Sequence, residues 1–361
     1  MLSKLKSFDW ALYALIFILV SISIVLIYSI SYVGPSNLAY KQAMFVLIGF
    51  VGMFGLSFVD YRIFKNWSAP LYLIGVAVLF AVLVFGTAQF GASRWIDLGF
   101  FDFQPSEIFK LLIIIVMAKF FSLRLGHSNV KNLINAFILA LIPIALVMKQ
   151  PDLGTAIVIG VVSIGLVFAI KLPRKTCALI VACLILAMPV GFFSLKDYQK
   201  QRLETFLNPN SDPSGAGYNI LQAKIAVGSG GLLGKGLGKG SQSELNFLPV
   251  AHTDFIFAGL AEVAGFVGSL IVIMLFMLVL WRVINIANRS QDDFGSLLAL
   301  GFAILILFQV FVNIGMNIGI MPVVGIPLPF ISYGGNSLIT NLIGVGIIQS
   351  ICRYNNINKK Y

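Results

Sequence analysis

The sequence predicts an all-α polytopic membrane protein with about ten transmembrane helices, from its composition, the length of its apolar runs and its charge distribution. Of the 361 residues, 59% are hydrophobic and only 11% are charged, whereas soluble domains carry about 25% charged residues. Hydrocarbon offers the backbone no hydrogen-bonding partner, so a membrane span must be a helix or part of a closed barrel. The apolar runs are about 20 residues long and lack two-residue alternation, which indicates helices.

Ten such runs make the chain a single integral membrane domain, residues 1–361, with no segment large enough for a separate soluble core. The first run is too long for a cleaved signal peptide and lacks a small-residue cleavage site, so we expect it to be a span. The predicted spans are 10–31, 39–59, 69–86, 105–123, 132–148, 153–171, 175–195, 254–281, 294–316 and 332–352.

An even number of spans places both termini on one side of the membrane, and basic residues identify that side as cytoplasmic. With the N-terminus inside, the inner loops and ends hold 15 of the 25 Lys and Arg residues but only 4 of the 14 Asp and Glu residues. The whole formal net charge of +11 then lies on the cytoplasmic face. The basic composition therefore reflects topology, and a nucleic-acid partner is not needed to explain it.

A long polar loop, residues 196–253, separates the seventh and eighth spans and is predicted to be extracytoplasmic. Its start, 196–205, is typical of an amphipathic helix at the membrane surface, and 220–227 predicts a second short helix. The glycine-rich run 228–240 lacks the spacing of a phosphate-binding loop, and no strand precedes it. We expect this run to be a flexible cover for a bound head group, with lysines that can help bind an anion.

Asp254 stands where this loop ends and the eighth span begins. A carboxylate at the membrane boundary is costly, so an ionisable residue there indicates a functional site. The alternative is that Asp254 caps the N-terminus of the eighth span. His252, two residues earlier, either orients Asp254 or is a loop residue with no role.

Other uncommon polar residues gather at the same, outer ends of the spans. Glu107 and Lys110 share a helix face one turn inside the outer boundary of the fourth span, either as a structural ion pair or as a pair facing the substrate. Asp152 precedes the sixth span and has the alternative role of a helix cap. The candidate substrate-binding residues in these outer segments are Arg94, Trp95, Glu107, Lys110, Lys149, Gln150, Asp152 and His252.

The last outer loop, 321–336, contains three prolines within eight residues and cannot form a regular helix. Irregular backbone at membrane depth is tolerated only against protein or a water-filled cavity. The loop is therefore either a structural re-entrant segment or part of a binding site. Ser332, Tyr333 and Asn336 are its candidate substrate-binding residues.

Together these segments resemble the signature blocks of the SEDS family (shape, elongation, division and sporulation). The blocks occur in the family's order from the first span to the last. They are Arg94-Trp95-Ile96, Gln104-Pro105-Ser106-Glu107 with Lys110, Gln150-Pro151-Asp152-Leu153-Gly154-Thr155, His252-Thr253-Asp254-Phe255 and Pro327-Leu328-Pro329-Phe330-Ile331-Ser332-Tyr333-Gly334-Gly335. Asn336 stands where the family usually has serine, which leaves a specific hydroxyl role at that position in doubt.

The resemblance implies a ten-helix fold and an inverting peptidoglycan glycosyltransferase that polymerises lipid II at the outer face of the bacterial cytoplasmic membrane and releases undecaprenyl diphosphate. The short termini resemble the elongation branch, which maintains cell shape, more than the division branch. The family's essential aspartate falls on Asp254, which we expect to be the general base. Arg94, Lys110 and Lys149 are candidates to relieve the charge of the leaving diphosphate.

The resemblance also implies partners: lipid II, the growing glycan strand, a class B penicillin-binding protein as transpeptidase, and other membrane proteins of the elongation complex. A divalent cation, Mg or Mn, is a candidate cofactor bound with the diphosphate, with unknown ligands, and no organic cofactor is expected. The alternatives are a flippase or transporter of the lipid-linked precursor, a scaffold that recruits partners, or the division or sporulation paralogue. A carrier needs access from both faces, whereas the charged and irregular segments here are concentrated outside.

Overall fold

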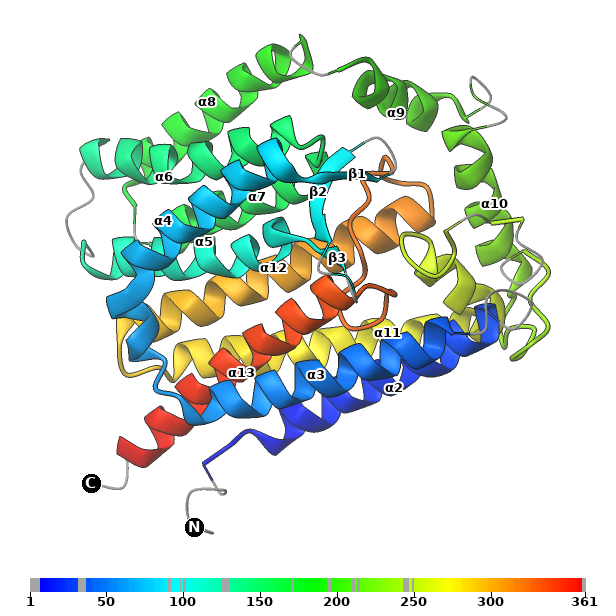
Figure 1. Ribbon diagram of the computed structural model, residues 1–361, viewed down its shortest axis with the longest axis horizontal. Coiled ribbons are helices and arrows are strands. Elements are labelled where there is room, and N and C mark those ends of the chain that lie inside the picture. The colour runs from blue at the N-terminus through cyan, green and yellow to red at the C-terminus, as the bar shows by residue number, and fades with distance from the viewer. Residues whose placement is uncertain are drawn as a thin grey trace.

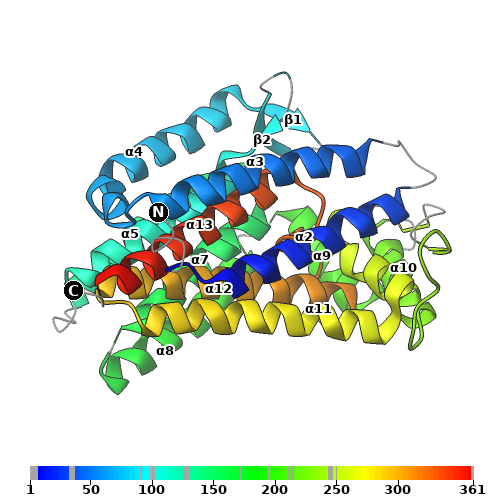
Figure 2. The same ribbon diagram turned by 90° about the horizontal axis from the view of Figure 1, so that it is seen from below.

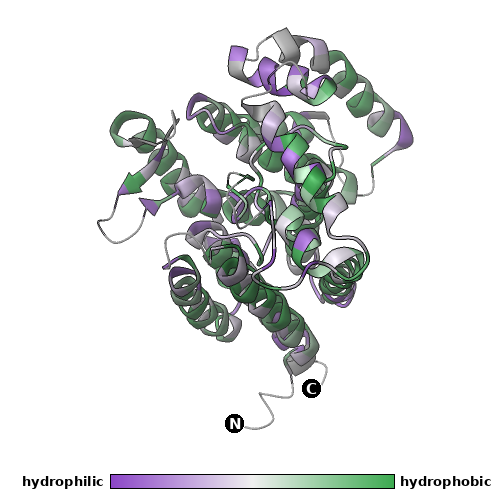
Figure 3. Cartoon of the chain, turned by 90° about the vertical axis from the view of Figure 1, so that its right-hand side faces the viewer, coloured by the Kyte–Doolittle hydropathy of each residue, from purple (hydrophilic) through white to green (hydrophobic). Residues whose placement is uncertain are grey.

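The computed structural model describes residues 7–31, 37–89, 92–97, 99, 102–124, 130–170, 172–193, 196–209, 212, 215–242, 247–248 and 250–358. Within them, twelve helices and three short strands form a helical bundle (Figure 1). The helices are α2 (Trp10–Ile30), α3 (Leu38–Phe58), α4 (Arg62–Phe85), α5 (Pro105–Ser122), α6 (Val130–Lys149), α7 (Leu153–Ala169), α8 (Arg174–Phe193), α9 (Asp197–Leu207), α10 (Ala216–Ser229), α11 (Ile256–Asn288), α12 (Asp293–Asn317) and α13 (Gly335–Asn358). Stretches of hydrophobic residues, green in Figure 3, run through the helices.

Each of the ten predicted spans overlaps one of these helices, namely α2 to α8 and α11 to α13. Several bounds differ, since α4 begins at Arg62 instead of 69 and α11 continues to Asn288 instead of ending at 281. In the part of the chain that the structure describes, seven helices are long and apolar enough to cross a membrane: α2, α3, α4, α6, α11, α12 and α13. Helix α7 is apolar over a shorter length of 17 residues, and α5 carries Glu107, Lys110 and Lys119. The all-helical membrane fold is thus confirmed, and α9 and α10 are the two helices expected within the long loop.

The two ends of the bundle differ in character. The first and last helices bring both termini to one end, while the strands, α9 and α10 lie towards the other (Figures 1 and 2). This arrangement is the one expected of a chain that crosses the membrane an even number of times. The polar segments singled out in the sequence accordingly share the end opposite the termini.

The centre of the bundle is formed by α5, α12 and α13. Most residues of α5 and α12 are buried, whereas α3 and α4 at the periphery bury only four residues each. Small residues allow close packing there, since a Cβ on Gly346 of α13 would stand 2.9 Å from Met53 Cα of α3. In lipid, where apolar burial drives helix association weakly, such close backbone contact is a main source of helix–helix attraction.

A three-stranded antiparallel sheet, which we did not predict, joins α4 to α5. Strand β2 (Ala92–Asp97) pairs with β1 (Thr87–Gln89) and with β3 (Asp102–Phe103). The strands are too short to leave a clear alternating pattern in the sequence. Strand β2 carries Arg94 and Trp95 at the end of the bundle opposite the termini.

Helix α11 is broken near its start, at Gly265, whose φ of 67° and ψ of −165° are not helical. The glycine-rich run supplies the hydrogen bonds that the break removes. Lys235 N and Gly236 N donate to Glu262 O and Val263 O at 2.9 and 3.0 Å, while Phe266 N donates to Gly231 O at 2.9 Å. The expectation of a flexible cover is therefore wrong for this run, which forms part of the helix packing.

The side chain of Glu262 fixes the same run from within. It is fully buried, and its Oε1 accepts from Lys235 Nζ at 2.8 Å, Gln242 N at 3.0 Å and Ser241 Oγ at 3.2 Å. A buried carboxylate is stable only when paired in this way. Lys235 is thus committed to Glu262, and Lys239 is the lysine of the run that remains exposed.

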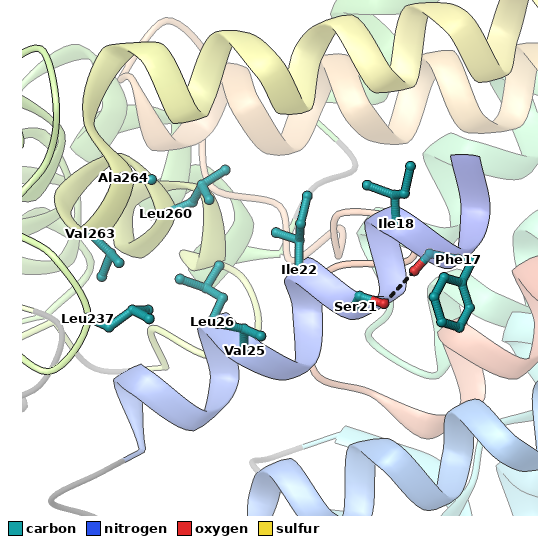
Figure 4. A pocket seen from close by; sticks show the side chains of 10 residues that line it. All are labelled: Phe17, Ile18, Ser21, Ile22, Val25, Leu26, Leu237, Leu260, Val263 and Ala264. Carbon is teal, nitrogen blue, oxygen red and sulfur yellow. Dashed lines mark hydrogen bonds between the residues drawn. The ribbon is translucent and has the colours of Figure 1, made fainter. Parts of the chain in front are cut away.

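An apolar groove of about 480 Å³ lies beside this break, between α2 and α11 (Figure 4). Six side chains of α2, three of α11 and Leu237 of the glycine-rich run line it. The hydroxyl of Ser21 donates to Phe17 O at 2.8 Å, so it presents no unsatisfied polar group. The groove is chemically distinct from the polar cluster at the outer ends of the helices.

Candidate active site

Asp254 lies in a turn immediately before α11 rather than in its first helical turn, because the helix begins at Ile256. The N-cap position is Phe255, and it makes no side-chain capping bond. Asp254 is therefore not the cap of this helix, which removes the structural alternative. Its carboxylate makes no hydrogen bond or ion pair with the residues that the structure describes, so its oxygens are free to accept one.

The surroundings of Asp254 are mostly protein, although its side chain keeps partial exposure. Burial raises the pKa of this carboxyl above its ordinary value of 3.8, and Asp152 adds to that effect, while Arg202 and Arg94 oppose it. A Cβ on Gly325 would stand 3.7 Å from Asp254 Oδ2. The proline-rich loop, residues 321–336, therefore passes close to the carboxylate. A carboxylate with a raised pKa is suited to accept a proton near neutral pH.

The proline-rich loop holds the Asp254 turn in place through the residues predicted in it. Ser332 Oγ donates to Thr253 O at 2.7 Å and accepts from Leu328 N at 2.8 Å. Tyr333 N donates to His252 O at 2.8 Å, and their rings meet edge to face, 5.5 Å apart. The loop is irregular as predicted, and Ser332 and Tyr333 contact the turn directly.

Asp152 connects three outer segments. It caps α7 by accepting from Thr155 N at 3.1 Å, as one alternative predicted. It also accepts from Gln104 Nε2 at 3.0 Å and lies 3.7 Å from Arg94 Nη1. The cap and the site are thus the same residue, because one carboxylate oxygen caps the helix while the other faces the start of α5.

Glu107 and Lys110 form a buried ion pair within the first two turns of α5, with Nζ 2.7 Å from Oε2. The two side chains are only 6% and 2% exposed. Ser106 Oγ, in the residue before Glu107, lies 3.4 Å from Asp152 Oδ2. The pair therefore lies close to the Asp152 cluster, which consists of Asp152, Gln104 and Arg94. The ion pair exists as expected, and its contact with substrate remains a prediction.

The other predicted residues are more peripheral. Lys149 ends α6 and is exposed, whereas the buried Gln150 donates to Leu79 O at 2.7 Å and so joins α6 to α4. Asn336 donates to Asp102 O at 2.7 Å, which ties α13 to the sheet. Trp95 is half-buried on β2. These contacts give Gln150 and Asn336 structural roles.

Three residues near Asp254 were not singled out in the sequence. The positive charge of Arg202 on α9 lowers the pKa of Asp254 against the larger effect of burial, and its guanidinium donates to Val323 O at 3.4 Å. Asn313 and Asn317 of α12 both donate to Asp254 O. Two amides four residues apart within an apolar span are a signal that the sequence contains, since such residues share one helix face.

Comparison with known proteins assigns the chain to a family. Residues 5–357 match the model of the FtsW, RodA and SpoVE family, described as cell cycle protein. The chain belongs to this family. This is the SEDS family, so the resemblance is confirmed along nearly the whole chain.

Relatives and solved structures of the FtsW/RodA/SpoVE family are similar over most of their length. The peptidoglycan glycosyltransferase MrdB of Escherichia coli K12 is 44% identical over 307 residues, which is 85% of this chain and 83% of that protein. The stage V sporulation protein E of Bacillus subtilis is 37% identical over 98% of this chain and 99% of that protein.

Among solved structures, a chain of a peptidoglycan synthase complex that coordinates polymerization and crosslinking matches with a TM-score of 0.85 at 32% identity, over 96% of this chain and 98% of that chain. The rod shape determining protein RodA of Thermus thermophilus matches with a TM-score of 0.73 at 31% identity, over 96% and 97% of the two chains. The chain therefore has the multi-pass helical fold of this family.

Proposed function

We propose that Asp254 is the general base with which this enzyme polymerises lipid II at the outer face of the cytoplasmic membrane during cell elongation. The chain is a peptidoglycan glycosyltransferase, most similar to the RodA branch. The observation that supports the proposed role is the position of Asp254. Its carboxylate receives no hydrogen bond from any described residue. Burial raises the pKa of this carboxyl, and the charges of Arg202 and Arg94 are close enough to lower it in part.

The proposed reaction is a direct displacement at the anomeric carbon of one lipid-linked sugar. The 4-hydroxyl of the acceptor sugar loses its proton to Asp254 and forms the new bond to that carbon. The bond from the carbon to the diphosphate breaks, and undecaprenyl diphosphate leaves with the electron pair. Base catalysis of such a step contributes roughly 10²–10⁴-fold.

We assign relief of the diphosphate charge to Arg94 and Arg202 in place of the earlier candidates Lys110 and Lys149. Lys110 is buried against Glu107, and Lys149 is exposed at the end of α6. The Nε of Arg94 is buried and has no hydrogen-bond partner among the residues that the structure describes, so this guanidinium has a donor to offer. Guanidinium groups suit phosphate oxygens, because their donors are arranged in a rigid fork.

A divalent cation fits this site only together with substrate. No group of three or more His, Cys, Asp or Glu side chains able to hold a metal occurs among the residues that the structure describes. Asp152 and Glu107 are committed to Arg94, Gln104 and Lys110, which leaves Asp254. A cation held by Asp254 would lower the pKa of that carboxyl and oppose its role as base. The described residues therefore do not fit a cation held by the protein, and a cation would have to be bound by the diphosphate of the substrate, whose charge it would offset.

The solved complex that this chain resembles coordinates polymerization with crosslinking. By this similarity we propose a class B penicillin-binding protein, a transpeptidase, as the partner. We place Asp254 on the extracytoplasmic side, because the basic residues of the sequence are concentrated at the other end. This placement matches the outer leaflet, where a polymerase would meet its lipid-linked substrate.

The test is glycan formation by the purified protein from lipid II in detergent, alone and with its transpeptidase partner, with and without EDTA. Detergent removes the second leaflet, so polymer demonstrates an enzyme and not a flippase. We expect polymer in the presence of the partner. The absence of polymer with partner and divalent cation both supplied would refute the proposed reaction. Loss of polymer on adding EDTA would assign the cation a part in it.

A further inference from the structure

We infer that Asn313 and Asn317 of α12 are positioning residues that hold the Asp254 turn and so set where its carboxylate stands. The inference rests on the proposed role of Asp254 as general base. Both residues lie inside the bundle on α12, and neither is one of the groups that react. Neither asparagine contacts the carboxylate, and both act through the main chain.

Both asparagine side chains donate to the same atom. Asn313 Nδ2 lies 3.1 Å from Asp254 O, and Asn317 Nδ2 lies 3.0 Å from it. A carbonyl oxygen has two lone pairs, so the two donors saturate it. Both side chains are fully buried, so neither is open to bulk solvent.

Each amide also holds a neighbouring segment. Asn313 Nδ2 donates to Ile326 O of the proline-rich loop at 2.8 Å. Asn317 Oδ1 accepts from Ala258 N of the first turn of α11 at 3.0 Å. The pair therefore ties the turn, the loop and the start of α11 to one rigid helix, which fixes their relative positions.

The carboxylate has no hydrogen bond of its own within the described structure, so its position follows from the backbone of the turn. Ser332 and Tyr333 hold the two residues before Asp254, and the two asparagines hold Asp254 O itself. Misplacing a reacting group by about 1 Å can cost about 10²-fold in rate. Loss of the clamp that Asn313 and Asn317 form is thus expected to lower the rate of the chemical step and to leave substrate binding nearly unchanged.

The same helix offers a matched control. Gln309 precedes Asn313 by one turn and therefore lies on the same face. It too is fully buried, and neither of its amide atoms has a hydrogen-bond partner in the described part of the chain. Gln309→Leu makes the same kind of change in the same helix without removing a bond to the Asp254 turn.

The test measures kcat and KM for lipid II polymerisation by Asn313→Leu, Asn317→Leu and Gln309→Leu in complex with the transpeptidase. We expect each asparagine variant to lose about 10- to 100-fold in kcat with KM within about twofold, and Gln309→Leu to match the parent. Asn313→Gln keeps an amide and should recover part of the rate. An equal loss in Gln309→Leu, or a rise in KM at unchanged kcat, would overturn the inference.

A second measurement does not depend on activity and separates this inference from the proposed function. A water-soluble carbodiimide with an amine modifies accessible carboxyl groups, and mass spectrometry of the peptides gives the rate at Asp254, with Asp152 as internal reference. We expect Asp254 to be modified several-fold faster in both asparagine variants than in the parent. In Gln309→Leu we expect the parent rate. Unchanged modification would refute the clamp even if the parent polymerises lipid II. If the parent has no polymerase activity but the asparagine variants are still modified faster than the parent at Asp254, the clamp would be supported and only the proposed function would be refuted.

Discussion

Replacing Asp254 by asparagine is expected to lower the initial rate of glycan polymerisation by about 10²–10⁴-fold, the contribution of a general base. Asparagine has nearly the same shape, but its amide does not accept the proton of a sugar hydroxyl. The fold should persist, because Asp254 does not cap α11 and its carbonyl keeps both asparagine partners. The measurement is polymer formed from lipid II by purified variant and parent at equal protein and substrate concentrations.

The same substitution is expected to raise the melting temperature at neutral pH. Burial raises the pKa of Asp254 above 3.8, so between that value and the raised one the folded protein binds more protons than the unfolded chain. The free energy of unfolding therefore falls as pH rises through this window, and above it the fold bears the full cost of the buried charge. Thermal unfolding in detergent checks the sign. A lower melting temperature together with lost activity would indicate a structural role instead.

Breaking the Glu107–Lys110 pair on one side is expected to destabilise the protein strongly. Both side chains are nearly inaccessible, so Glu107→Gln or Lys110→Met leaves one uncompensated buried charge, which costs about 3–5 kcal/mol. The double variant removes both charges and should regain most of the free energy of unfolding. Chemical unfolding of the two single variants and the double variant in mixed micelles measures the effect.

Activity of the double variant then separates a structural pair from a substrate-facing one. We expect its polymerisation rate to stay well below the parent rate, because the pair lies within the first two turns of α5 beside Ser106 and the Asp152 cluster. A double variant that regains stability and polymerises at the parent rate would leave the pair with a structural role alone.

The helices could be predicted from the sequence because the membrane imposes them. Every span needs about 20 apolar residues, and ten such runs are present. The amphipathic segment at 196–205 is also a local pattern, and it appears as α9. The three prolines at 321–336 are another, and the backbone there is irregular. Asp152 and the Glu107–Lys110 pair could be predicted as a cap and an ion pair, since both depend on residues close in sequence.

Contacts between distant segments could not be predicted in this way. The glycine-rich run looked flexible on composition alone, yet it completes the broken α11 through backbone hydrogen bonds, which no side-chain pattern records. Arg202 reaches the site because α9 folds back over the proline-rich loop. Gln150, although beside Asp152 in sequence, turns inward to Leu79, because neighbouring residues at a helix boundary face different directions.

The pH dependence of the polymerisation rate at saturating lipid II tests the base role of Asp254 most directly. The charged and titratable groups around it are Arg202, Arg94, Asp152 and His252. Burial lowers the pKa of His252 from its ordinary value of 6.5, so His252→Gln is the necessary control. We predict a rate that rises with pH through an apparent pKa above 3.8, with the same rise in His252→Gln and its loss in Asp254→Asn. A rise that disappears in His252→Gln, or one that survives in Asp254→Asn, would contradict the assignment of Asp254 as the base.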